Sequence, residues 1–75
     1  MIEEIKKAVH EAAAGKHKIA MFHFQVLKHA SELRQMDPRQ FCKEIAVPET
    51  YQTEFRKMIS LEQLMRVEGF SLRRT

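Results

Sequence analysis

The sequence is poor in the residues that cross-link or interrupt a chain. Its 75 residues include one cysteine, two glycines and two prolines. The single cysteine, Cys42, excludes an internal disulfide, and no spacing of cysteine and histidine predicts a zinc site. We therefore expect no metal and no cofactor. A free thiol and the lack of a secretory signal predict a protein of the reducing cytoplasm.

Long apolar runs are also missing. The longest, residues 19–24, is interrupted by His23, whereas a membrane-spanning helix needs about 20 apolar residues. We expect no membrane partner. Apolar residues still make up 44% of the chain, which is enough to fold. The chain begins with Met1, so we expect it to be complete, with residues 1–75 forming a single helical domain.

The short length limits the core. A domain of this size buries only about 60% of the surface that its unfolded chain exposes. Disulfides and metals are not available as additional sources of stability, so self-association is the expected one. We predict a homodimer.

A large excess of charge of one sign is absent as well. The formal net charge is +3, and the calculated pI is about 9.3. Such a balance permits a nucleic-acid partner without requiring one.

No stretch alternates apolar and polar residues for long enough to predict a strand. We expect an all-α fold, a compact bundle of about five helices. Gly15 is predicted to take the left-handed position after the first helix, and Gly69 to end the last. Asp37 and Pro38 predict a helix start, as does the capping pattern in residues 60–63. The predicted helices are 2–14, 18–36, 38–45, 49–59 and 61–68, with a frayed tail at 73–75.

The segment "FCKEIAVPETYQTEFRKMISL" resembles a helix-turn-helix unit, which we place at about residues 37–60. Phe41 and Ile45 occupy core positions of its first helix, and Phe55 resembles the apolar anchor of its second. Ala46 stands at the turn, where the family usually has glycine. Gln52 departs from the pattern, because the apolar residue expected there lies one place earlier.

A wider stretch, which adds "KIAMFHFQVLKHASEL", is similar to a family of small bacterial proteins with a helix-turn-helix-like domain. The similarity runs from Lys18 to Leu61. It implies a DNA-binding or regulatory protein. Our leading prediction is a repressor-like transcription regulator of a bacterium or mobile element, with double-stranded DNA as its partner.

Helical periodicity divides the second unit helix into two faces. Tyr51, Phe55, Met58 and Ile59 fall on one side at 100° per residue. The polar residues on or beside the other side are of types that contact bases and phosphates. The predicted DNA contacts are Thr50, Gln52, Thr53, Arg56 and Lys57, with Arg56 on a base edge and Lys57 on a phosphate. Further phosphate-contact candidates are Arg39, Lys43, Lys16 and Lys18.

A different function uses the same helices. Any amphipathic helix has a polar outer face, so the alternative prediction is a protein-interaction module of bacterial or phage origin that keeps the helical layout without binding DNA. Charge distinguishes the two functions. A basic face clear of Glu49 and Glu54 favours DNA, whereas neutralisation by these carboxylates favours a protein partner.

An enzyme is not predicted, and neither are catalytic residues. Cys42 has no accompanying base and no loop that would stabilise an oxyanion, so a structural thiol is expected. The steps from His17 to His23 and His29 do not converge on one helix face. His23 is expected to be partly buried and hydrogen-bonded, and Glu54 to form a structural pair with a neighbouring cation.

Overall fold

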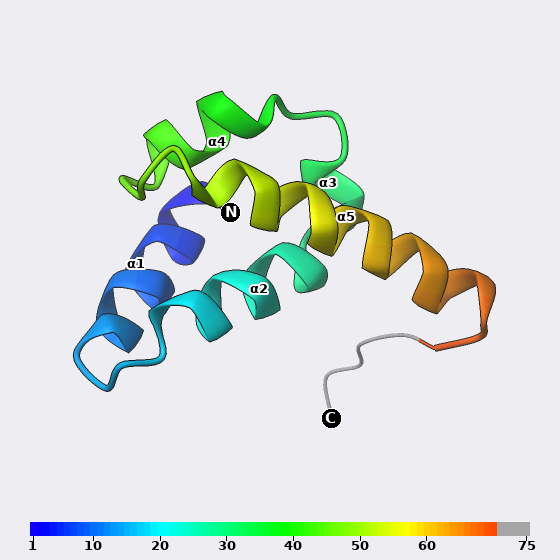
Figure 1. Cartoon of the computed structure of the whole chain (residues 1–75), viewed down its shortest axis with the longest axis horizontal. Coiled ribbons are helices and arrows are strands. Elements are labelled where there is room, and N and C mark those ends of the chain that lie inside the picture. The colour runs from blue at the N-terminus through cyan, green and yellow to red at the C-terminus, as the bar shows by residue number, and fades with distance from the viewer. Residues whose placement is uncertain (71–75) are drawn as a thin grey trace.

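The computed structural model describes residues 1–70, and this part of the chain contains helices and no strand (Figure 1). The expected all-α fold is confirmed. The helices are α1 (Ile2–Ala13), α2 (Lys18–Lys28), α3 (Ala30–Leu33), α4 (Pro38–Glu44) and α5 (Tyr51–Val67).

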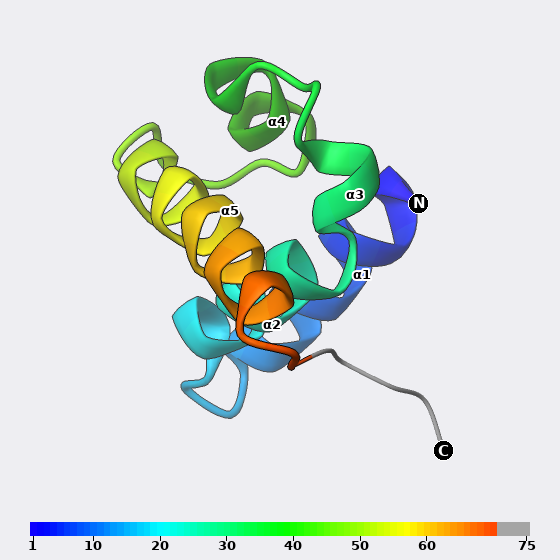
Figure 2. The same cartoon turned by 90° about the vertical axis from the view of Figure 1, so that its right-hand side faces the viewer.

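The longest helix, α5, organises the bundle. The helices α1 and α2 pack against each other, and α5 lies across α2 (Figures 1 and 2). It also contacts α3 and α4, so one helix touches most of the others. The described part of the chain thus forms one core.

The core is built from apolar residues at helical spacing. The inward positions of α1 are Ile5 and Val9, and both are fully buried. The remaining core residues lie on α2 to α5 and in the loop before α5: Phe22, Val26, Ala30, Leu33, Phe41, Cys42, Ile45, Val47 and Phe55. Because Phe55 is only 3% exposed, its predicted position as the anchor of α5 is confirmed.

Four aromatic rings join three of the helices. Phe41 of α4 lies 4.9 Å from Phe55 of α5, measured between ring centroids. Phe22 of α2 lies 5.0 Å from Tyr51 and 6.0 Å from Phe41. Edge-to-face and tilted pairs at these distances are favourable beyond their burial. The cluster therefore fixes the rotation of α5 about its own axis.

The start of α4 follows its sequence signals. Pro38 occupies the first helical turn, and the side chain of Asp37 accepts a hydrogen bond of 2.9 Å from the backbone N–H of Gln40. This cap satisfies one of the free donors at the helix start. The expected helix start is confirmed.

Three helices end in the same way, with a residue of positive φ. These residues are Lys16 (64°), Ala46 (57°) and Gly69 (88°). After Ala46, the N–H of Val47 donates to the carbonyl of Cys42, and the N–H of Ala46 donates to that of Lys43. This pair of bonds is a Schellman motif. Gly69 ends α5 as predicted.

The prediction for Gly15 is wrong by one residue. Lys16, not Gly15, takes the left-handed conformation after α1. The N–H of His17 bonds to the carbonyl of Ala12, so the turn closes one residue later than the glycine suggests. A lysine tolerates this conformation at some cost because the turn satisfies two carbonyls.

The prediction of one helix over residues 18–36 is also wrong. The chain kinks at His29, whose φ and ψ are −107° and 19°, and the short α3 follows. The N–H of Leu33 still bonds to the carbonyl of His29. The kink allows Val26 before it and Leu33 after it to be buried in the same core.

A third prediction, the break at Ser60, fails because α5 continues from Tyr51 to Val67. The serine and the glutamine three residues later match a capping box, but the helix has no free end there for Ser60 to cap. The start of α5 also lies two residues later than predicted. The predicted frayed tail, residues 73–75, lies outside the described residues.

We expect Phe55→Ala to lower the free energy of unfolding by about 3–5 kcal/mol, because the cavity would lie between α4 and α5. Urea denaturation followed by circular dichroism measures the change. Val67→Ala is the matched control, since Val67 lies on the same helix and is 75% exposed. Equal losses for the two variants would show that α5 is rotated differently.

We expect Ala46→Gly to raise the stability by about 1 kcal/mol, because glycine adopts positive φ without the steric cost that Ala46 bears. The same denaturation measurement applies. Ala20→Gly, at an exposed position within α2, should instead lose about 0.5–1 kcal/mol. A loss at both positions would contradict the left-handed turn.

Candidate nucleic-acid interface

The helix-turn-helix-like unit consists of α4, the turn at Ala46 and α5. The turn buries Val47 beneath it, and the contact between Phe41 and Phe55 joins the two helices. Since Phe55 points inward, the residues on the opposite side of α5 point outward. The predicted buried side of this helix is correct: Met58, Ile59 and Tyr51 all pack against the core.

The structure gathers several of the predicted DNA contacts on the outer side of α5. Thr53, Arg56 and Lys57 are exposed and line a shallow hollow. Ser60, Leu61 and Leu64 complete its lining. Thr50 is exposed at the helix start, whereas Gln52 is half-buried on the flank.

Two of the basic residues are neutralised by neighbours. Arg39 forms an ion pair with Glu49 at 3.1 Å, and Lys57 forms one with Glu54 at 3.3 Å. Arg56 has no ion-pair partner among residues 1–70. Both carboxylates of the charge criterion, Glu49 and Glu54, thus pair with cations, which counts toward a protein partner. The remaining positive charge of this surface is modest and is concentrated at Arg56.

A second group of cations lies along α4. Lys43 is exposed and lines a hollow together with Arg39. Glu49 lines the same hollow and carries the opposite charge. Lys43 makes no ion pair within the described part of the chain. The two predicted phosphate contacts on α4 thus share one side, and one of them is neutralised.

The other two phosphate-contact candidates, Lys16 and Lys18, lie at the α1–α2 turn and have different surroundings. Lys18 is half-buried, and its Nζ lies 5.8 Å from the centre of the Tyr51 ring, a cation–π distance. It is thereby held near the start of α5. Lys16 is exposed in the turn itself. The structure thus places Lys18, but not Lys16, against the start of α5.

Glu54 has a structural role, as expected. It accepts a hydrogen bond of 2.8 Å from Nε2 of His23, and Lys57 donates to its other oxygen. These two hydrogen bonds lower the pKa of Glu54 below its usual value. The half-buried His23 is hydrogen-bonded, as predicted, and the contact ties α2 to α5.

Cys42 and His10 are held by burial and by a hydrogen bond, respectively. Burial raises the pKa of the Cys42 thiol, and Glu49 adds to the effect, so the thiolate is disfavoured. Among residues 1–70, no three histidine, cysteine or acidic side chains gather as metal ligands. His10 instead bonds to the carbonyl of Ile45 at 2.8 Å, which joins α1 to the end of α4.

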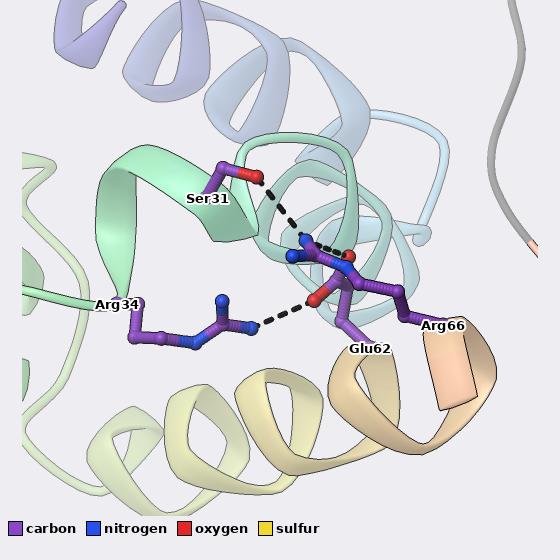
Figure 3. A network of polar contacts seen from close by, with 4 residues as sticks. All are labelled: Ser31, Arg34, Glu62 and Arg66. Carbon is purple, nitrogen blue, oxygen red and sulfur yellow. Dashed lines mark hydrogen bonds and ion pairs between the residues drawn. The ribbon is translucent and has the colours of Figure 1, made fainter.

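A polar network anchors the C-terminal half of α5 (Figure 3). Glu62 accepts a hydrogen bond from Arg34 at 2.7 Å and another from Arg66 at 2.7 Å. Arg66 also donates to Ser31 at 3.2 Å. The hydrogen bond from Arg66 is the largest cause of the lowered pKa of Glu62, and that from Arg34 adds to it. Sequence reasoning missed this network because Ser31 and Arg34 come from α3 and its end, although the spacing of four between Glu62 and Arg66 was a readable signal.

Sequence reasoning also did not predict the exposed apolar face on the same half of α5. Leu61, Leu64 and Val67 are 39%, 57% and 75% exposed. Their outward direction follows from the phase of Phe55 once α5 is continuous. The predicted break at Ser60 hid this pattern, because it divided the helix into two units of independent phase.

The comparison with protein families decides the classification. A family model described as "HTH-like domain" matches residues 1–68. The chain belongs to this family. The comparisons with curated proteins and with solved structures give no match. Within residues 1–70, the HTH-like domain has no helix of the length and apolarity that crossing a membrane requires.

The lowered pKa of Glu62 makes the stability of this HTH-like domain depend on pH. The contribution is present above the ordinary carboxyl value of 4.5 and is lost as the pH falls through the lower folded value. We expect Glu62→Gln to cost about 1 kcal/mol at neutral pH, a figure reduced for solvent screening, and to cost less in acid.

Urea denaturation at neutral and acidic pH measures this difference. Glu44→Gln is the matched control, because Glu44 is exposed and has no ion-pair partner among residues 1–70. If Glu62→Gln loses the same stability at both pH values, the ionised carboxylate is not the stabilising form.

Proposed function

We propose that the α4–α5 unit binds double-stranded DNA and acts as a repressor-like transcription regulator in the cytoplasm. The observation that carries the proposal is Arg56. It is an exposed arginine without an ion-pair partner among residues 1–70, and it lies on the outer side of the second unit helix. In helix-turn-helix proteins this helix enters the major groove.

The surrounding side chains have distinct roles in the proposed complex. Arg56 bonds a guanine edge with two donors, and Thr53 lies one turn before it for a thymine methyl or a phosphate. Gln52, on the flank, reaches an adenine edge. Thr50 stands exposed at the start of α5, where its hydroxyl can donate to a phosphate. Lys18 lies beside this end of the helix.

Few cations are free for phosphate, which limits the affinity. Arg39 and Lys57 share their charge with Glu49 and Glu54, whereas Lys43 does not share its charge with a described carboxylate. Each phosphate contact contributes about 0.9 to the slope of log affinity against log salt. We expect a slope of about −3 per chain, which corresponds to three or four contacts.

A protein-interaction module is the second candidate. It is favoured by the two neutralised cations and by the apolar residues Leu61, Leu64 and Val67, which DNA does not require. In this case the outer face of α5 binds a protein, and duplex DNA binds feebly at low salt. No reaction is proposed for the chain.

We expect Arg56→Ala to remove about 1–3 kcal/mol of discrimination between the preferred duplex and one with its guanine replaced. The preferred duplex is first selected with wild type from random sequences. Fluorescence anisotropy then measures both affinities. Lys7→Ala is the charge-matched control, because Lys7 is exposed on α1. Failure of wild type to select any duplex would contradict the proposal.

We expect Lys57→Ala to weaken all duplexes together and to reduce the salt slope by about one. Its stability should stay within about 0.5 kcal/mol of wild type, since Lys57 is exposed. Titrations at two salt concentrations measure the slope. Loss of discrimination without a change of slope would give Lys57 the base-reading role instead of Arg56.

A further inference from the structure

The outer face of α5 changes character along its length. Its first half carries Thr53, Arg56 and Ser60, which are polar and exposed. In its second half Leu61 and Leu64 point outward. Both halves belong to one continuous helix, so the apolar part is held rigidly beside the polar part. The network of Glu62 and Arg66 fixes this half from the opposite side.

Four of the outward residues form a single row. Lys57, Leu61, Leu64 and Glu68 are spaced by four, three and four residues, which is the spacing of a helix–helix seam. All four are exposed. The row has leucines in its middle, a cation at one end and an anion at the other.

This row is complementary to itself when a second copy is turned end for end. A two-fold axis between Leu61 and Leu64 places each leucine opposite the other leucine of the second copy. The same axis places Lys57 opposite Glu68 at both ends. Opposite charges therefore meet twice, and the exposed leucines bury each other. We propose that two copies of this chain form an antiparallel dimer through α5.

The two charged residues are suited to this pairing. Glu68 follows the last turn of α5, where the partial negative charge of the helix end disfavours a carboxylate. Lys57 of the second copy would offset that charge. Glu68 has no ion-pair partner among residues 1–70. Lys57 has three N–H donors, so it can keep Glu54 while it binds Glu68. In the dimer Lys57 is therefore taken from the phosphate contact proposed above, and that contact belongs to a chain that binds DNA without the seam.

The dimer also arranges the proposed DNA-binding surfaces, and this step rests on the proposed function. The two-fold axis is perpendicular to the α5 helices of both copies. The same flank of α5 in each copy therefore faces the same side of the dimer. Arg56 lies on this flank, about 110° around the helix from the seam. With a rise of about 1.5 Å per residue, the starts of the two α5 helices lie roughly 34 Å apart along the helix direction and the two Arg56 residues roughly 20 Å apart. The helix starts, rather than Arg56, therefore lie at the spacing of one turn of DNA.

Sedimentation equilibrium over a range of micromolar concentrations tests the dimer. We expect the mass of wild type to rise from one chain to two. Leu64→Asp should remain a monomer with an unchanged circular dichroism spectrum, because it places a carboxylate in the seam. Phe24→Asp, at an apolar position on α2 that is 46% exposed, should still dimerise. A wild type that stays monomeric overturns the proposal.

Charge reversal tests the antiparallel register. Lys57→Glu and Glu68→Lys should each weaken the dimer at least tenfold, because like charges then meet at both ends. A mixture of the two variants should form a dimer of one chain of each, with opposite charges restored. The double variant should dimerise like wild type. If the mixture associates no better than either variant alone, residues 57 and 68 do not face each other.

The dimer and the DNA-binding proposals fail separately. A monomer that selects a duplex would overturn the dimer and leave DNA binding intact. A dimer that obeys the charge tests but selects no duplex would overturn DNA binding and leave the seam intact. A dimer that selects inverted repeats spaced by one helical turn supports both.

Discussion

The contact between Phe41 and Phe55 determines most of what this domain presents to its surroundings. It joins α4 to α5 at 4.9 Å between ring centroids, and Phe22 extends the cluster to α2. A helix held by such an anchor cannot rotate without opening a cavity. Every outward residue of α5, from Thr53 to Glu68, therefore takes its direction from one buried ring.

The turn before α5 is held by its own hydrogen bonds and by burial. Ala46 adopts positive φ, which is unfavourable for alanine, yet the two hydrogen bonds of the Schellman motif and the burial of Val47 compensate. The resemblance to helix-turn-helix proteins placed a glycine-like position at this residue. The backbone conformation agrees with that expectation, although the side chain does not.

Periodicity predicted which residues are buried better than it predicted where helices end. Phe41, Ile45 and Phe55 are core residues as expected, because a 3.6-residue period and burial depend on the same geometry. Helix ends depend on competition between local and tertiary interactions. The capping pattern at Ser60 does not start a new helix, because α5 continues through it and Glu62 bonds to Arg34. At His29 the chain kinks where one continuous helix was predicted, and no proline or glycine marks the kink.

The candidate site was predictable in its residue types but not in its charge. Thr53, Arg56 and Lys57 lie together on the outer side because the phase of α5 was read correctly. Whether each cation is free depends on carboxylates from the turn and from the same helix. Glu49 reaches Arg39 on α4, and such a pairing between segments cannot be read from spacing along one helix.

The continuous α5 gives one helix two surfaces of different chemistry. A polar face around Arg56 suits a hydrated, charged partner, whereas the row around Leu61 and Leu64 suits an apolar one. Had the helix broken at Ser60, the two surfaces would turn independently. Because it does not, whatever binds the leucines also orients Arg56. A second copy bound there orients two such arginines toward the same side, which a single small domain cannot do.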